Sequence, residues 1–187
     1  MILRRATSAD LPDILPLAAS TVPGFVEFLW SELAVPPETG REFGTRAQLG
    51  FIERGETMIA EVDGHIAGFE IAYQMEPEAH SFVPGMCPLL EPHLALFHLA
   101  AGSWYLHGLG TVPEFRGQGV AGALLDHCDS QARENGCTTV SLLVIDTNTS
   151  AINYYLKRGF TTIAREPVVK GGWQSNAREW LLMTRPV

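Results

Sequence analysis

The sequence is poor in cysteine. Its 187 residues include three, Cys87, Cys128 and Cys137, an odd number with no Cys-x-x-Cys pair. No cysteines and histidines share the spacing of a zinc site, so the pattern indicates neither a disulfide framework nor a structural metal. Free thiols suit a reducing compartment, and we therefore expect a cytoplasmic protein that holds no metal ion.

Long hydrophobic runs are also missing. No stretch approaches the roughly 18 apolar residues of a membrane-spanning helix. The most apolar segment, Leu94 to Ala101, is short and is interrupted by His98. The N-terminus has neither the apolar core nor the cleavage site of a secretory signal. We expect neither a membrane span nor a signal peptide.

Positive charge is scarce as well. Lys and Arg number 13 against 21 Asp and Glu, which gives a formal net charge of −8. A nucleic-acid-binding surface needs clustered Lys and Arg, so the composition argues against that class of protein. Hydrophobic residues make up 46% of the chain, enough for one substantial core, and the length predicts a single domain over residues 1–187.

Apolar periodicity predicts a mixed α/β fold. Two strand-like runs flank Asp63-Gly64, a dipeptide that indicates a tight hairpin because both turn positions need positive φ. A strand over 103–112, a helix over 119–135 and a strand over 138–145 form a β-α-β unit. Other expected strands cover 2–6, 57–62, 65–75, 160–164 and 180–184; other expected helices cover 8–19 (capped by Ser8), 24–33, 39–53, 89–101 and 150–158.

Two segments receive a more specific interpretation. The helix over 119–135 is amphipathic, and the segment 76–102 contains four prolines and reads as an insertion or a substrate loop. The residues expected on the buried stripe of that helix are Ala121, Leu124, Leu125, Cys128 and Ala132.

A glycine-rich loop, Arg116-Gly117-Gln118-Gly119-Val120-Ala121-Gly122, precedes the helix of the β-α-β unit. Unpaired amide N–H groups and the dipole of a helix N-terminus make such a loop an anion site. Alternatively, the segment is an ordinary helix start without a ligand, and its glycines only allow close packing. The three glycines also match G-x-G-x-x-G, with Asp146 about 20 residues on, so a dinucleotide-binding protein is a rival. Three features argue against a dinucleotide-binding protein. The four residues from Pro113 to Arg116 separate the strand from the first glycine, whereas the dinucleotide-binding turn follows its strand immediately. The chain after residue 100 is too short for the remaining parallel strands, and the antiparallel hairpin upstream is foreign to that fold.

Two motifs resemble the GCN5-related N-acetyltransferase (GNAT) family. The segment from Leu109 to Ala121 matches the family's strand and glycine-loop pattern through Arg116, Gly119 and Ala121. The segment from Asn148 to Phe160 matches a later signature through Asn148, Ala151, Tyr155, Gly159 and Phe160. The resemblance implies a central mixed, mostly antiparallel sheet, splayed at a cofactor cleft and flanked by helices.

The resemblance further implies acetyl-CoA as co-substrate. Its pyrophosphate would lie on the loop amides and its pantetheine arm along the preceding strand, where Gly108 and Gly110 are suitable bulge residues. Asn148 is expected both to cap its helix and to touch this arm. The implied cofactor-binding residues are Leu109, Gly110, Thr111, Arg116, Gly117, Gln118, Gly119, Val120, Ala121, Gly122, Asn148 and Tyr155.

The implied reaction is acetyl transfer to an amine, which needs a base, an oxyanion donor and an acid. By resemblance, the Leu109 N–H is the oxyanion donor and Tyr155 protonates the departing thiolate. Alternatively Tyr155 is a core aromatic, and Tyr154 is the fallback acid.

The base has several candidates. His107 lies two residues before Leu109, so both project from one face of the strand unless a bulge intervenes. An equally good interpretation is that His107 is a half-buried histidine that is hydrogen-bonded to the backbone and has no catalytic role. There are two alternatives to His107 as the base. One is Glu70, on the second strand of the hairpin, and the other is a chain of water molecules.

The acceptor is expected to be the primary amine of a small molecule, attacked directly in a ternary complex. Residues 20–37 and 76–102 are expected to select it, and homodimers are common in the family. A non-catalytic acyl-CoA sensor remains an alternative function on the same fold. Possible pocket aromatics, equally readable as core, are Phe25, Phe28, Trp30, His80, Phe82, His93 and His98.

Overall fold

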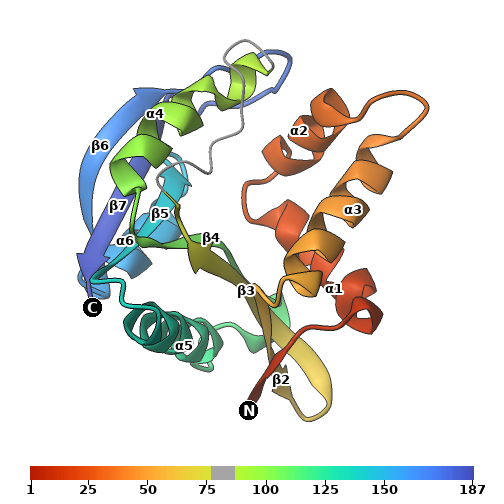
Figure 1. Ribbon diagram of the computed structural model, residues 1–187. Helices are drawn as coiled ribbons and strands as arrows, with labels where there is room; N and C mark the ends of the chain where they lie inside the picture. The colour runs from red at the N-terminus through yellow and green to blue at the C-terminus, as the bar shows by residue number, and fades with distance from the viewer. Residues whose placement is uncertain (77–86) are drawn as a thin grey trace. The chain divides into compact units, whose positions relative to one another are not determined.

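The computed structural model describes residues 1–76 and 87–187 (Figure 1). They form two compact units, each assembled from two stretches of the chain. The first unit contains Met1–Ala72 and His107–Cys128, and the second contains the described residues of Tyr73–Leu106 together with Asp129–Val187.

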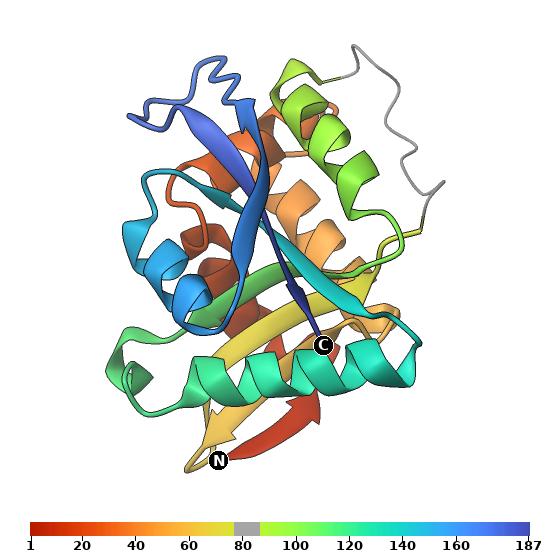
Figure 2. The ribbon, with the colours of Figure 1, turned by 90° about the vertical axis from the view of Figure 1, so that its left-hand side faces the viewer.

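The first unit is built on an antiparallel β-meander. Strand β1 (Ile2–Arg5) pairs with β2 (Thr57–Val62), and β2 pairs with β3 (His65–Gln74). The connecting turn has φ of 50° at Asp63 and 79° at Gly64, which confirms the tight hairpin predicted from that dipeptide. This unit includes α5 (Val120–Glu134) as far as Cys128, and Figure 2 shows that helix in front of the strands and the three N-terminal helices behind them.

The three N-terminal helices are α1 (Leu11–Ser20), α2 (Phe25–Leu33) and α3 (Gly40–Glu53). Helix α3 begins with a capping box, in which Thr39 Oγ1 accepts from the Glu42 N–H and Glu42 accepts from the Thr39 N–H. A Cβ on Gly44 would lie 2.3 Å from the Trp30 ring, so the glycine allows α2 and α3 to approach closely. The predicted pocket aromatics Phe25 and Trp30 are buried core residues, and Phe28 is half-buried.

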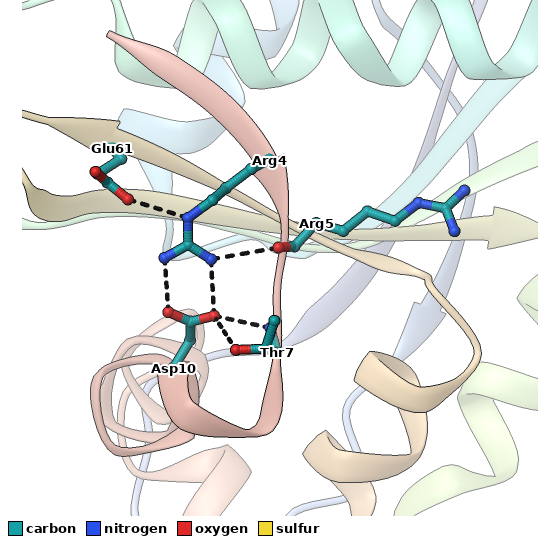
Figure 3. A network of polar contacts seen from close by, with 5 residues as sticks. All are labelled: Arg4, Arg5, Thr7, Asp10 and Glu61. Atoms are coloured by element: carbon teal, nitrogen blue, oxygen red, sulfur yellow. Dashed lines mark hydrogen bonds and ion pairs between the residues drawn. The ribbon is translucent and has the colours of Figure 1, made fainter.

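The cap of the first helix differs from the prediction. Thr7, rather than Ser8, begins the helical segment, as the N-cap of a short 3-10 turn over Ser8–Asp10 that leads into α1. Asp10 accepts hydrogen bonds from the Thr7 N–H at 2.7 Å and from its hydroxyl at 2.9 Å. Figure 3 shows that Arg4 donates to both oxygens of the same carboxylate through Nη1 and Nη2. Arg4 Nε also donates to Glu61 at 3.0 Å. The Asp10 carboxylate therefore bonds both to Thr7 in the turn and to Arg4 on β1, and these bonds stabilise a helical segment that begins at Thr7.

Helix α5 packs on the meander of the first unit. Val120 and Leu124 are fully buried with Ala60 and Ala67, and Leu109 packs against this cluster. The predicted stripe holds for Leu124, Leu125, Cys128 and Ala132, all fully buried, but Ala121 is only half-buried. Val120, one turn before Leu124, occupies the buried position instead.

The second unit contains the rest of the strands. Within it, the Trp104–Leu106 part of β4 (Trp104–Thr111) pairs in parallel with β5 (Thr139–Ile145), as the β-α-β prediction requires; the His107–Thr111 part of β4 belongs to the first unit. Strand β7 (Glu179–Pro186) runs antiparallel to β5 and to β6 (Thr161–Pro167). Helix α4 (Glu91–Ala100) contacts β6 and β7, and α6 (Thr149–Lys157) precedes β6.

Hydrogen-bonded neighbours place the seven strands in the order β1-β2-β3-β4-β5-β7-β6. The sheet is mixed and mostly antiparallel, with helices against it, which confirms the predicted fold class. Among the described residues no single helix is long and apolar enough to cross a membrane; the segments 8–20 and 25–33 meet the length and composition test only as a pair bent by 108°.

Part of the predicted insertion lies outside the described residues. Residues 77–86, with His80 and Phe82, are not described. The remainder folds as a 3-10 turn over Pro88–Leu90 followed by α4. His93 is a buried residue whose ring centroid lies 4.4 Å from that of Trp180, whereas His98 is exposed.

Candidate functional site

The strand that precedes the glycine loop packs tightly on β3. A Cβ on Gly110 would lie 2.5 Å from Phe69 Cε1, and one on Gly68 would lie 2.6 Å from the Gly110 carbonyl oxygen. Gly108 is less restricted, since its Cβ would sit at an ordinary 3.4 Å from the same ring. The pairing of β2 with β3 has a register irregularity between Ala60 and Glu61. Close packing against Phe69 therefore accounts for the glycine at position 110, and the role of Gly108 and Gly110 as bulge residues stays a prediction.

The imidazole of His107 lies against helix α3. Its ring centroid is 4.8 Å from that of Phe51, and the side chain keeps a solvent-exposed surface. Desolvation by the surrounding protein, with the positive charge of Arg54 as a second cause, lowers the pKa of His107 to about 4. The imidazole is thus neutral at pH 7, the form in which it accepts a proton.

His107 and Leu109 do not share a face of the strand. Leu109 packs against Val120 and Leu124 on α5, whereas His107 contacts Phe51 on α3, behind the strands in Figure 2. Strict alternation would have placed both on one side, so the regular alternation of the strand is interrupted between them, which is the exception that the prediction allowed.

Glu70 lies on the α5 side of the meander. It pairs across the strands with Met58, and Gly68 on the same face contacts Val120. Only 2% of Glu70 is exposed, and its Oε1 bonds to His127 Nδ1 on α5. The two candidate bases therefore differ in setting: Glu70 is enclosed beneath α5 and His107 is accessible.

The glycine loop has the geometry of an anion site. Gly117 and Gly119 adopt left-handed φ values of 77° and 85°, which only glycine adopts without strain. A short 3-10 turn over Pro113–Phe115 precedes them, and Gln118 Nε2 donates to the Glu114 carbonyl at 2.9 Å. The first amides of α5, from Val120 to Gly122, have no intrahelical acceptor. Arg116 is exposed beside them.

The later motif lies in the second unit. Asn148 caps α6 by accepting a hydrogen bond from the Ala151 N–H at 3.2 Å, as its capping prediction requires. Tyr155 is buried on the same helix, with its ring 5.5 Å from Phe160 and 5.6 Å from Tyr154. Asp146, the proposed ribose ligand of the dinucleotide rival, instead accepts from the Arg178 N–H at 3.1 Å.

The structure thus assembles one part of the predicted site in the first unit: His107, Leu109, Gly110, Thr111 and the loop 116–122. Asn148 and Tyr155 belong to the second unit. Among the described residues, no cluster of three or more His, Cys, Asp or Glu has a geometry that could hold a metal ion.

Three neighbours of the site were missed by sequence reasoning. Phe51 contacts His107, Phe69 covers Gly110, and His127 pairs with Glu70. Each contact joins residues that lie at least 41 positions apart and depends on how the elements pack. The only signal was the glycine at 110, a residue type that permits close approach of a ring.

Comparison with known proteins agrees with this geometry. The sequence matches the model of the Acetyltransferase (GNAT) family over residues 24–160. A thialysine N-epsilon-acetyltransferase of Sus scrofa is 29% identical over 85 residues, which make up 43% of this chain and 48% of the relative. The chain aligns with half or less of the length of the curated relatives it matches.

Solved structures share the whole fold. An agmatine N-acetyltransferase superimposes with a TM-score of 0.68 at 16% identity, covering 100% of this chain and 99% of the other. The PaiA N-acetyltransferase of Thermoplasma acidophilum, determined in complex with coenzyme A, gives 0.62 at 15% identity, with 100% and 98% covered. Likeness at these identities establishes the fold alone.

Proposed function

The chain belongs to the acetyltransferase (GNAT) family, and on that premise we propose that it moves an acetyl group from acetyl-CoA to a primary amine of a small molecule. The observation that carries the proposal is the loop at the start of α5. Two left-handed glycines and a free helix N-terminus lie directly after a strand of the sheet, together with an exposed arginine.

The loop fits the pyrophosphate of acetyl-CoA. Nothing lies within 4 Å of where a Cβ would stand on Gly117 or Gly119, so a phosphate can approach the backbone there. The amides of Gly117 and of residues 119–122 would donate to its oxygens, whereas the Gln118 N–H donates to the Phe115 carbonyl at 3.4 Å; Arg116 would add positive charge. The same chemistry explains how a chain of net charge −8 holds a polyanion, because binding depends on local donors.

The acetyl transfer itself needs a base for the amine. We assign that role to His107, whose neutral and accessible imidazole can take the proton directly or through a water. Glu70 is disfavoured because it is enclosed and already bonded to His127. The amine then attacks the thioester carbonyl, and the Leu109 N–H is proposed to donate to the oxyanion.

The departing thiolate needs a proton. Tyr155 is proposed to supply it, since a phenol of pKa about 10 is acidic enough to protonate a thiolate and is regenerated from solvent. Asn148 is proposed to contact the pantetheine arm through the part of its amide that does not cap α6. Transfer is direct, within a complex of enzyme, acetyl-CoA and amine.

The small-molecule acceptor is supported by the relatives. The Sus scrofa relative is named for acetylating the side-chain amine of an amino acid, thialysine. A cytoplasmic location and a homodimer stay parts of the proposal, to be tested by fractionation and by solution mass.

Two measurements test this function. Acetyl-CoA at 100 times its dissociation constant is expected to stabilise the fold by about 2.7 kcal/mol, whereas NAD is expected to have no effect. Initial rates of CoA release are then measured with a panel of amines, and intersecting double-reciprocal plots are expected for direct attack. Stabilisation without amine-dependent CoA release would make the protein an acyl-CoA sensor instead.

A further inference from the structure

The last turn of α6 is attached to strand β7 by the side chain of Arg185. Tyr155, the proposed acid, lies in that turn, three residues before the C-cap Arg158. The last carbonyls of a helix have no regular donor within the helix, and helix ends fray unless other groups bind them. Arg185 Nη1 donates to the Arg158 carbonyl oxygen at 2.9 Å. Its positive charge also suits the negative end of the helix dipole.

The guanidinium of Arg185 also lies over the aromatic ring that follows the helix. Its central carbon is 4.9 Å from the centroid of Phe160, within the range of a cation–π contact. Phe160 is fully buried, and its ring centroid lies 5.5 Å from that of Tyr155 with the two planes at 60°. Aromatic pairs of this edge-to-face kind have a preferred geometry. The position of Arg185 therefore affects the Tyr155 ring through Phe160.

The backbone between the two rings is folded back on the end of α6. The Phe160 N–H donates to the Tyr155 carbonyl oxygen at 3.0 Å. Gly159, between the helix and β6, adopts a left-handed φ of 85°, and a Cβ there would lie 3.4 Å from Arg185 Cδ. The aliphatic part of Arg185 thus lies beside the glycine at which the chain reverses, and its guanidinium binds the residues on either side of that glycine.

A carboxylate fixes the other edge of the guanidinium. Asp129 on α5 accepts a hydrogen bond from Arg185 Nη2 and is only 8% exposed. Because the two Nη groups of a planar guanidinium point in different directions, these bonds set both its position and its plane. Both residues belong to the same unit as Tyr155. An enclosed ion pair is weak evidence for stability, since the cost of desolvation offsets its attraction, so the precise geometry of this pair suggests another role.

We propose that Arg185 is a positioning residue that orients the phenol of Tyr155, and this inference rests on the proposed role of Tyr155 as the acid. Arg185 acts on the reaction only through Tyr155, by way of the Arg158 carbonyl and the Phe160 ring. Protonation of a departing thiolate needs the hydroxyl at hydrogen-bond distance, and a misplacement of about 1 Å can cost about 10²-fold in rate. A nine-residue helix is marginal by itself, so its last turn depends on such outside contacts.

Arg185→Lys tests the proposal while it keeps the positive charge. An ammonium group lacks the planar fork, so it cannot stack on Phe160 and serve both oxygen acceptors at once. The variant is expected to lower kcat about tenfold and to leave the KM for acetyl-CoA and for the amine unchanged. Arg165→Lys is the matched control, because Arg165 on β6 also pairs across to β7, with Glu179 at 2.8 Å, but does so at the exposed surface. The control is expected to keep the wild-type kcat.

A double-mutant cycle separates positioning from a general loss of structure. If Arg185 acts through the hydroxyl of Tyr155, Arg185→Lys is expected to cause no further loss of kcat in the Tyr155→Phe background, where that hydroxyl is gone. The same fold-loss in both backgrounds would overturn the proposal, because it would show an effect that does not need the hydroxyl.

A spectroscopic measurement follows the ring itself and does not depend on activity. Protein labelled with 3-fluorotyrosine reports on its tyrosines by ¹⁹F NMR, and the Tyr155→Phe variant identifies the signal of Tyr155. Arg185→Lys is expected to shift this signal and Arg165→Lys is expected to leave it in place. A signal that Arg185→Lys does not move would overturn the positioning role. If Arg185→Lys fails to fold, Asp129→Asn, which weakens the hold on the guanidinium, is measured in the same way.

The outcomes separate this inference from the proposed function. A slow Tyr155→Phe protein in which the loss caused by Arg185→Lys is fully additive overturns the inference alone and leaves the acetyltransferase and its acid intact. Wild-type turnover in Tyr155→Phe removes the acid and the inference with it. Failure to release CoA with any amine, together with no binding of acetyl-CoA, removes the proposed function as a whole and therefore the inference as well.

Discussion

The ring of Phe69 lies directly over Gly110, where a Cβ would stand 2.5 Å from Cε1. Contacts that short do not occur between real Cβ atoms and rings, so the glycine is a packing requirement of the strand that leads to the loop. Because Phe69 is fully buried, its ring has no space into which it can retreat.

Gly110→Ala is therefore expected to destabilise the fold by about 1–3 kcal/mol, the usual cost of overpacking a core. Chemical denaturation measures the loss. Gly108→Ala is the matched control, since its Cβ would make only an ordinary 3.4 Å contact with the same ring. A Gly110→Ala variant as stable as Gly108→Ala would contradict the packing account.

His107 and Glu70 can be separated by paired substitutions. His107→Gln is expected to lower kcat by about 10²- to 10⁴-fold with little change in melting temperature, because the side chain is accessible and acts as the base. Glu70→Gln is expected to lower the melting temperature instead, since it weakens an enclosed pair with His127. The reverse pattern, a fully stable Glu70→Gln protein without activity, would move the base to Glu70.

The pH profile follows from the low pKa of His107. Because desolvation by the surrounding protein and the charge of Arg54 lower that pKa to about 4 from the usual 6.5, the imidazole stays neutral down to about pH 4. The acid limb of kcat/KM attributable to the base is expected near pH 4. Arg54→Gln removes one cause of the lowering, so that limb is expected to move to higher pH. An acid limb near 6.5 in the wild type, unmoved by Arg54→Gln, would argue against His107.

Tyr155→Phe tests the proposed acid. The substitution removes only the hydroxyl, so the buried ring still packs against Phe160 and stability is expected to hold. Turnover is expected to fall by about 10²-fold while the affinity for acetyl-CoA, measured by calorimetry, is unchanged. Tyr154→Phe, at the neighbouring position, serves as the control. Equal rates in both variants would remove Tyr155 from the mechanism.

The Arg4–Asp10 pair predicts an acid-sensitive start of α1. Hydrogen bonds from Arg4 lower the pKa of Asp10 from 3.8 to about 2, so the folded state binds its proton less readily than the unfolded state. That stabilisation is complete above about pH 4 and is lost as the pH falls to 2. Asp10→Asn is expected to cost on the order of 1 to 2 kcal/mol at pH 7, a value reduced by the partial exposure of Arg4.

Equilibrium unfolding at pH 7 and pH 2 checks this expectation. Asp13→Asn, an exposed acid of the same helix, is expected to show no such difference. If Asp10→Asn were as destabilising at pH 2 as at pH 7, the effect would not come from the ionised pair.

Local sequence signals predicted most elements of the fold. Asp63-Gly64 located the hairpin because its φ values are a property of those two residues, and Asn148 located the start of α6 for the same reason. Ser8 was chosen as a cap because Ser is a good one, but the structure uses Thr7 since Asp10 is held by Arg4 and Glu61 lies beside it. Side-chain pairs of this kind join separate segments of the chain, so they leave no periodic pattern in the sequence.

The site was predictable only where a motif is continuous. The loop from Arg116 to Gly122 combines two left-handed glycines with a helix start, and both are local properties. The side of the strand on which His107 lies was not predictable. Regular alternation places His107 and Leu109 on the same side, and the contact of His107 with Phe51 depends on how α3 packs. The joint role of Tyr155 and His107, like the single-domain organisation and the splayed sheet, stays a prediction.

The most direct test of the central claim follows the acetyl group itself. Acetyl-CoA labelled with ¹³C at the acetyl carbonyl is incubated with the protein and a primary amine, and the label is followed by NMR. We expect an amide carbonyl signal that grows with the loss of the thioester signal, and neither change with His107→Gln on the same timescale. A label that remains in acetyl-CoA, or that appears only as free acetate, would contradict acetyl transfer to an amine.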